Sequence, residues 1–183
     1  MSDFFVALVP ERIFIQPAEQ AAMEKRMVEW MQENGWIETQ KSDCTLGGEA
    51  GWRFTPSGSR HIADEDYSDL LTCGFGVEKH EGKGVFTNLE GGLEAALCPV
   101  CGENVEEQFY DMVGDWNAAE GSPPVTCPQC GAASDIREYR LEPQWGFSQI
   151  GFEFWNIGEL VPEFVEEFVA VLGEPVRVVW AHL

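Results

Sequence analysis

The chain has 183 residues, 44% of them hydrophobic, and it carries 32 Asp and Glu against 11 Lys and Arg, for a formal net charge of −21. This acidic excess argues against direct binding to a phosphate backbone, which needs clustered Lys and Arg. No apolar run approaches the roughly 18 residues that a membrane-spanning helix requires, so we expect no membrane segment. The apolar fraction is ample for a packed core, and the length allows one domain with an addition or two small domains.

The N-terminal part predicts a strand, a helix and a second strand. Phe4–Val9 is a short apolar run of the kind found in buried strands. A helix is expected over Ala18–Asn34, ended by Gly35, because apolar side chains recur there at helical spacing. These are Met23, Met27, Trp30 and Met31. Trp36–Thr39 then predicts a strand.

The middle of the chain, rich in Gly, Ser and Pro, gives weaker signals. The pattern favours four short elements before the cysteine-rich part. They are a strand at Gly51–Thr55 with a turn at Pro56–Ser59, a short helix at Asp64–Leu71, and hairpin strands at Thr72–Val77 and Gly84–Asn88 around a turn at Lys79–Lys83.

Two runs follow one formula, C-P-x-C-G, at residues 98–102 and 127–131. Each C-x-x-C pair lets two sulfurs reach one metal ion from a single tight turn, and the glycine after each pair suits the sharp bend. Four thiolates fill the coordination shell of a tetrahedral zinc ion and leave no position for water or substrate. We therefore predict one structural Zn²⁺ per chain, with four ligands: Cys98, Cys101, Cys127 and Cys130.

Two disulfides, four unrelated thiols or a redox pair are the alternatives to a zinc site. The first residues, Met1–Asp3, have no basic region, and Phe4–Val9 is too short for the apolar core of a secretory signal. We accordingly expect a cytoplasmic protein, in a reducing compartment that keeps thiols available for a metal.

The paired C-P-x-C-G runs resemble the knuckles of zinc-ribbon proteins over about residues 96–140. The resemblance implies metal binding and leaves function open, because zinc ribbons serve transcription, RNA, ribosomal and purely structural roles. The spacer between the two pairs is longer than the 15–20 residues typical of such sites. We therefore expect an extra loop in the ribbon at Gly114–Pro124.

The C-terminal part predicts strands at Ile136–Leu141 and Phe147–Trp155, the second with a bulge at Gly151. A helix is expected at Glu159–Leu172 and a closing strand at Val176–Ala181. Aromatic residues crowd the strand and cannot all face one side of it. They are Trp145, Phe147, Phe152, Phe154 and Trp155. Either some are exposed at a protein interface, or the strand is buried on both faces, beneath the helix and against a dimer partner or the ribbon.

Strand, helix and strand thus open and close the chain. This order predicts an α+β fold in which two βαβ-like units form a ferredoxin-like or related sandwich with an inserted zinc ribbon. The domain assignment is 1–95 for the N-terminal part, 96–140 for the ribbon and 141–183 for the βαβ unit that completes the body. The middle segment is expected to add strands at an edge of the sheet. An unrelated α+β fold with several hairpins is the alternative.

For function, we expect a non-enzymatic, acidic, zinc-stabilised protein-binding module. A negative surface attracts a basic partner, as in inhibitor or immunity-type proteins, and a homodimer belongs to the same class. Solubility alone is the simpler explanation of the charge.

Two other functions stay open at this stage. One is an enzyme with a site around residues 55–80 that uses His61, His80 or Cys73 with nearby carboxylates. The other is a mimic of nucleic-acid charge. No motif of a known catalytic class occurs, buried thiols are the commoner state of Cys44 and Cys73, and a histidine near a carboxylate is expected by chance in so acidic a chain. We therefore assign no catalytic or cofactor-binding residue.

Overall fold

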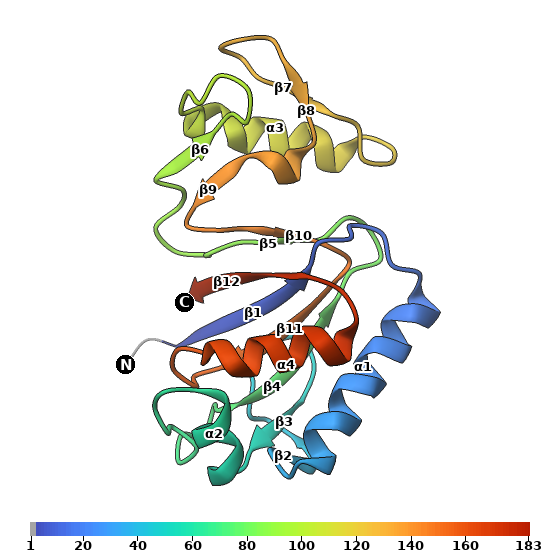
Figure 1. Cartoon of the computed structure of the whole chain (residues 1–183), viewed down its shortest axis with the longest axis vertical. Coiled ribbons are helices and arrows are strands. Elements are labelled where there is room, and N and C mark those ends of the chain that lie inside the picture. Colours follow the sequence, from blue (N-terminus) through green and yellow to red (C-terminus); the bar gives the residue numbers. More distant parts are fainter. Residues whose placement is uncertain (1–2) are drawn as a thin grey trace.

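The computed structural model describes residues 3–183, and its largest feature is a six-stranded antiparallel sheet (Figure 1). The strands follow the spatial order β12–β1–β11–β4–β3–β2. Their bounds are β1 Phe4–Pro10, β2 Ile37–Ser42, β3 Gly51–Phe54, β4 Gly74–Lys79, β11 Ile150–Trp155 and β12 Val176–His182.

Two helices, α1 (Pro17–Glu33) and α4 (Pro162–Leu172), lie against one face of this sheet (Figure 1). The main core fills the space between them and the strands. Phe152 and Phe154 of β11 meet Phe168 and Phe164 of α4 edge-on, with ring centroids 5.2 and 5.5 Å apart. Alternate residues of a strand share a face, so β11 places its aromatic rings under the helix in pairs.

The α+β class is confirmed, and both terminal units are present as β1–α1–β2 and β11–α4–β12. The expectation that the middle segment adds strands at an edge is wrong. Strands β3 and β4 lie between β11 and β2, so β2 is the edge strand. The reason is burial: Phe75 of β4 is fully buried beside the rings of β11, whereas β2 carries mostly exposed polar side chains.

Three local predictions in the middle segment are also wrong. The turn expected at Pro56–Ser59 begins helix α2 (Pro56–Ile62), because Thr55 accepts a hydrogen bond from the Gly58 N–H as its N-cap. No helix forms at Asp64–Leu71, where the chain makes turns and bends. Strand β5 (Val85–Phe86) does not form a hairpin with β4 but pairs with the distant β10 (Gly146–Phe147).

Strands β5 and β10 lie between the sheet and the cysteine-bearing part (Figure 1), and Phe86 of β5 packs on the second face of the sheet over β1, β11 and β12. A small apolar cluster joins the two layers. It comprises Phe5, Ala7, Val9, Phe86, Trp155, Val179 and Ala181. Gly151 pairs regularly with Glu78, so the predicted bulge is wrong, and the glycine instead gives the Phe86 ring room to approach.

All five aromatic residues from Trp145 to Trp155 are buried, so they form no exposed interface. Phe152 and Phe154 face the helices, and Trp155 packs on Phe5 on the opposite face with ring centroids 4.6 Å apart. The strand is therefore buried on both faces within a single chain.

The cysteine-bearing unit has its own core and its own helix, α3 (Glu106–Ala118). Its short strands are β6 (Ala95–Leu97) paired with β9 (Arg140–Glu142), and β7 (Val125–Thr126) paired with β8 (Ala133–Ser134). The extra loop predicted at Gly114–Pro124 is wrong in its first part, because α3 continues to Ala118. The segment expected as a strand from Ile136 begins as a turn of 3-10 helix, Ile136–Glu138.

Lys83, in the segment between β4 and β5, connects the body to this unit. Its Nζ donates to the backbone carbonyl oxygens of Ala119 at 2.6 Å and Gly121 at 2.7 Å, and also to that of Trp116. The ammonium group lies over the Trp116 ring, 4.6 Å from its centroid. A cation here satisfies carbonyls that the end of α3 leaves unpaired.

Candidate metal centre

The four cysteines of the two C-P-x-C-G runs come together in the structure. All four Sγ atoms lie within 4.8 Å of one another. The Cys98 and Cys130 sulfurs are 3.9 Å apart, as are those of Cys101 and Cys127. Tetrahedral zinc with bonds of about 2.3 Å needs sulfurs about 3.8 Å apart, so the cluster has the size of a four-thiolate metal site. These spacings are far longer than a disulfide bond, and every cysteine is free.

The two knuckles repeat the same backbone geometry. The Gly102 N–H donates to the Cys98 carbonyl at 3.0 Å, and the Gly131 N–H donates to the Cys127 carbonyl at 2.9 Å. The two glycines have φ values of 75° and 74°, in the left-handed region that residues with a Cβ rarely adopt. The glycine of each C-P-x-C-G run therefore closes its turn, as the sequence predicts.

Backbone N–H groups also point at the sulfurs. Val100 donates to Cys98 Sγ and Gln129 donates to Cys127 Sγ, each at 3.4 Å. The backbone N–H groups of Cys101 and Val100 hold the pKa of the Cys98 thiol below its usual range, at about 6. Cys98 thus favours the thiolate, which is the form that binds a metal ion, whereas burial and the neighbouring thiols raise the pKa of Cys101.

One cysteine of each knuckle faces the protein interior. Cys98 and Cys127 are buried in the core of the unit, while Cys101 and Cys130 are exposed. An ion held by all four sulfurs therefore lies at the margin of the core. Such an ion would join the turn before α3 to the turn between β7 and β8.

Sequence reasoning missed Tyr139, which is 1% exposed and belongs to the same core. Its hydroxyl has no hydrogen-bond partner among residues 3–183. Burial raises the pKa of this hydroxyl, and the nearby Cys98 and Cys127 raise it further. A buried hydroxyl beside thiolates suits a donor to sulfur. No local pattern marked Tyr139, since its position depends on how β9 follows the second knuckle.

The residues proposed for an enzyme site lie in different surroundings. His61 stacks on Trp36 with ring centroids 4.2 Å apart, and its Nε2 lies 3.4 Å from a carboxylate oxygen of Glu167. His80 packs edge-on against Phe86. Cys73 is fully buried, and burial raises its pKa to about 12, which suits an inert thiol. Across the described chain, the four clustered cysteines are the only group of three or more His, Cys, Asp and Glu with ligand atoms close enough to hold a metal.

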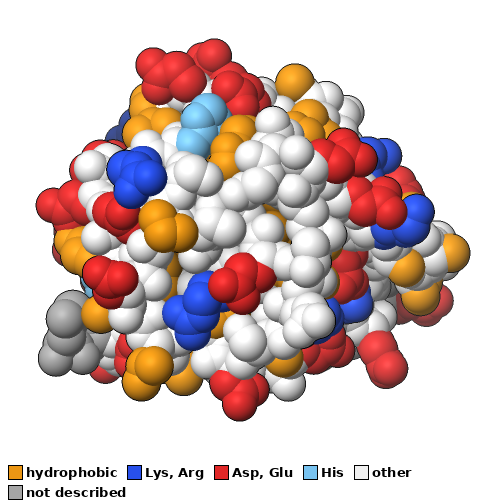
Figure 2. Space-filling model, turned by 90° about the horizontal axis from the view of Figure 1, so that it is seen from below, with side chains coloured by type: hydrophobic (Ala, Val, Ile, Leu, Met, Phe, Trp, Pro, Cys, Tyr) orange, Lys and Arg blue, Asp and Glu red, His pale blue; other side chains and the backbone are white. Residues whose placement is uncertain are grey.

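Acidic side chains are spread over the surface. Seen from the end opposite the cysteine-bearing unit, Asp and Glu are scattered over the face, with fewer Lys and Arg among them (Figure 2). Several of the basic side chains are already paired within the chain, as Arg12 is with Glu19 and Glu174. The uncompensated charge that faces solvent is therefore negative.

Comparison of the chain with protein-family models, with curated proteins and with solved structures gives no match. Among residues 3–183, none of the helices has both the length and the hydropathy needed to cross a bilayer.

Proposed function

We propose that the four cysteines hold one structural zinc ion and that the chain is a non-enzymatic protein-binding module for a basic partner. The observation that carries the metal assignment is the closed set of four sulfurs with tetrahedral spacing. When bound, zinc supplies four strong bonds to a unit too small to be held by its core alone.

The zinc-ribbon assignment rests on the two equivalent knuckles and the β7–β8 hairpin that the second knuckle closes. Helix α3 in the spacer distinguishes this unit from a plain ribbon. The predicted bounds, 96–140, take in the cysteines and α3, although Trp145 and Phe147 also contribute to its core. A free thiol cluster of this kind suits a reducing compartment such as the cytoplasm.

The body is proposed as an elaborated ferredoxin-like sandwich. If β3 and β4 are left out, the remaining strands follow the order β12–β1–β11–β2, with α1 and α4 on one face. That is the arrangement of two interlocked βαβ units, and the middle segment then widens the sheet by two strands.

The case for a basic partner rests on charge. A formal net charge of −21 gives long-range attraction to a cationic protein and repels nucleic acid. An inhibitor or immunity-type protein for a basic enzyme or toxin fits this chemistry. The separate surroundings of His61, His80 and Cys73 favour binding over catalysis.

The zinc assignment is tested by metal analysis of protein purified without added metal. We expect about one zinc per chain, and none in the Cys98→Ser/Cys127→Ser double variant, because two remaining thiolates cannot close the shell. Cys44→Ala, which alters a buried thiol outside the cluster, should keep the ion. Full zinc content in the double variant, or none in the native chain, would falsify the site.

The partner is tested by capture from a lysate of the native host at about 50 mM and 500 mM salt, with an unrelated protein of similar negative charge as control. A partner captured only by this chain should then bind as a purified protein, with an affinity that falls steeply as salt rises. If the unrelated acidic protein captures the same partner, the interaction is not specific to this chain, and the surface charge would serve only solubility.

A further inference from the structure

The two edge strands of the main sheet differ in chemistry. Strand β2 has four consecutive exposed residues, Glu38 to Lys41, and all four are polar. Such an edge resists pairing with another strand. The other edge, β12, has the sequence VRVVWAH. Five of these seven residues are apolar, and such an edge strand is a template for a further strand unless something covers it.

The backbone of β12 is open over its centre. At one end, the His182 N–H donates to Asn88 and the His182 carbonyl accepts from Glu90, both on the side away from β1. Alternate residues of a strand direct their backbone groups to the same side, so Val178 and Trp180 also point their N–H and C=O groups outward. No residue between 3 and 183 bonds to these outward groups. Since backbone groups in folded proteins are almost always paired, these outward groups can pair with a further strand.

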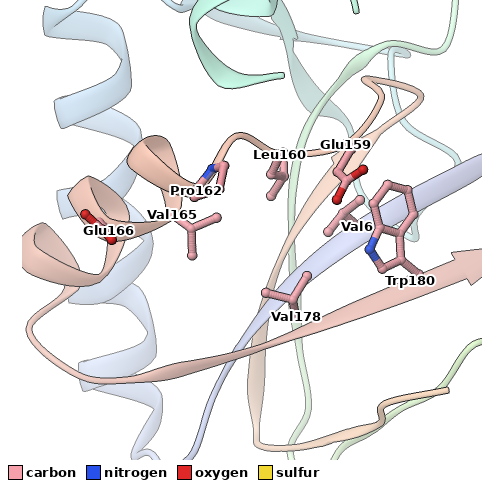
Figure 3. Close-up of a pocket in the computed structure, with 8 residues that line it drawn as sticks. All are labelled: Val6, Glu159, Leu160, Pro162, Val165, Glu166, Val178 and Trp180. Atoms are coloured by element: carbon pink, nitrogen blue, oxygen red, sulfur yellow. The ribbon is translucent and has the colours of Figure 1, made fainter. Parts of the chain in front are cut away.

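An apolar pocket of about 380 Å³ lies beside the same stretch. Figure 3 shows Val178 and Trp180 on β12 facing Leu160 and Val165 across the pocket, with Val6 between them. Helix α4 packs on β11 through Phe164 and Phe168, whereas Val178 and Trp180 of β12 are only partly buried. Trp180 is held in place by stacking on Phe4, with ring centroids 6.2 Å apart.

The charged side chains that line this pocket are both acidic. Glu159 lies beside Trp180, and Glu166 lies on α4 (Figure 3). No Lys or Arg is among the residues that line it. A ligand that fits here therefore combines an apolar side chain with neighbouring positive charge.

We propose that the outer edge of β12 and this pocket bind an extended segment of a basic partner protein as a seventh strand of the sheet. The inference rests on the proposed function and identifies the surface through which the basic partner binds. Val178 and Trp180 supply the backbone hydrogen bonds, one apolar side chain of the segment enters the pocket, and Lys or Arg two residues away on the same face meet Glu159 and Glu166. A second copy of this chain is a poorer occupant, because it brings another net charge of −21.

The test uses a nine-residue peptide, KTKTITKTK, with blocked ends. In an extended conformation its Ile and Lys side chains share one face, so Ile can enter the pocket with Lys on both sides. In the matched control, the Ile and the two Lys nearest to it are N-methylated. This change keeps the charge and the side chains but removes the N–H groups that would bond to β12. A third peptide, ETETITETE, reverses the charge.

We expect KTKTITKTK to slow hydrogen exchange of the Val178 and Trp180 amides and to bind at least tenfold more tightly than the other two peptides. Val178→Lys, which places a bulky cation in the pocket, should weaken binding at least tenfold. The matched change Thr39→Lys on the polar edge strand β2 should leave binding unchanged. The N-methylated peptide keeps the test valid if Val178→Lys fails to fold.

Equal binding of the methylated and unmethylated peptides would overturn strand addition while leaving a charge-based partner in place. Binding of neither peptide would also overturn the inference, and the lysate experiment would then decide the proposed function separately. Self-association of the chain that protects the same two amides without peptide would assign the edge to a second copy instead.

Discussion

The buried carboxyl group of Glu153 makes the stability of the sheet depend on pH. The side chain is 7% exposed, and it lies on the face of β11 opposite the helices, where it accepts a hydrogen bond from Trp155 Nε1 at 2.9 Å. Burial raises its pKa to about 7, and the negative charge of Glu78 adds to the rise. The folded chain therefore binds the proton more tightly than the unfolded chain does.

The contribution of Glu153 to the free energy of unfolding therefore falls as pH rises. Its contribution is fully present below the ordinary carboxyl pKa of about 4.5 and is lost as pH rises through about 7. At 1.36 kcal/mol per pKa unit, the rise in the pKa of Glu153 corresponds to a decrease of about 3 kcal/mol in the free energy of unfolding between low and high pH. Urea unfolding of the native chain and of Glu153→Gln at pH 5 and pH 8 measures it. The variant should gain stability relative to the native chain at pH 8, and the gain should shrink at pH 5.

Glu78→Gln is the matched control, because this carboxyl is partly exposed on the neighbouring strand. It should change the pH dependence far less than Glu153→Gln does. A Glu153→Gln variant that keeps the full pH dependence of the native chain would show that the carboxyl is hydrated in solution.

At the scale of single elements, Gly151 shows how one strand accommodates another layer. A Cβ on this glycine would lie 2.4 Å from the Phe86 ring, so the ring or the backbone of β11 would have to shift. We expect Gly151→Ala to lower the free energy of unfolding by about 1–3 kcal/mol, the usual cost of overpacking. Thermal or urea unfolding measures the change.

Two further variants separate overpacking from the general effect of losing a glycine. Phe86→Leu in the Gly151→Ala background should recover part of the loss, because the smaller side chain vacates the space. Gly48→Ala, where nothing lies within 4 Å of the new methyl group, should change stability by less than about 0.5 kcal/mol. No recovery in the double variant would mean that Phe86 is not the obstacle.

The elements that could be predicted from the sequence are those with strong local signals. β1, α1, α4 and β12 all carry apolar periodicity or continuous apolar runs, and each forms near its expected bounds. Helix α3 was missed because Gly114 and Asn117 weaken its pattern, while Phe109 and Trp116 stabilise it through packing. The pairing of β5 with β10 joins residues far apart in the chain, and no local pattern records such a contact.

The candidate site was predictable to a similar degree. The C-P-x-C-G runs identified all four cysteines, because ligand spacing within each knuckle is a local property. Tyr139 could not be found in the same way. Tertiary packing places this residue in the same core as Cys98 and Cys127.

At the scale of the whole molecule, two separate cores predict two levels of stability. The main core lies between the six-stranded sheet and its helices, and the second core lies in the cysteine-bearing unit. A chelator at neutral pH should therefore speed hydrogen exchange in α3, β6 and β9 while the amides of β1 and β11 stay protected. Added zinc should restore the slow exchange. Loss of protection throughout the sheet would contradict this and would make the metal essential to the whole fold.

Lys83 tests how firmly the two cores are joined. Lys83→Met removes a charged donor to three carbonyl groups and should lower the free energy of unfolding by about 1–3 kcal/mol. The first sign should be faster hydrogen exchange of the backbone amides in the last turn of α3. Lys79→Met, which breaks a more exposed pair with Glu24, should cost less than about 1 kcal/mol. Equal effects of the two changes would leave Lys83 with no special role in the junction.

The pairing of β5 with β10 has a consequence for the history of the chain. The chain enters the cysteine-bearing unit after β5 and leaves it before β10, and these two strands are antiparallel neighbours only about 5 Å apart. A short turn can bridge that gap, so a single genetic insertion or deletion could add or remove the entire unit. The order of strands in the body would be the same before and after such an event.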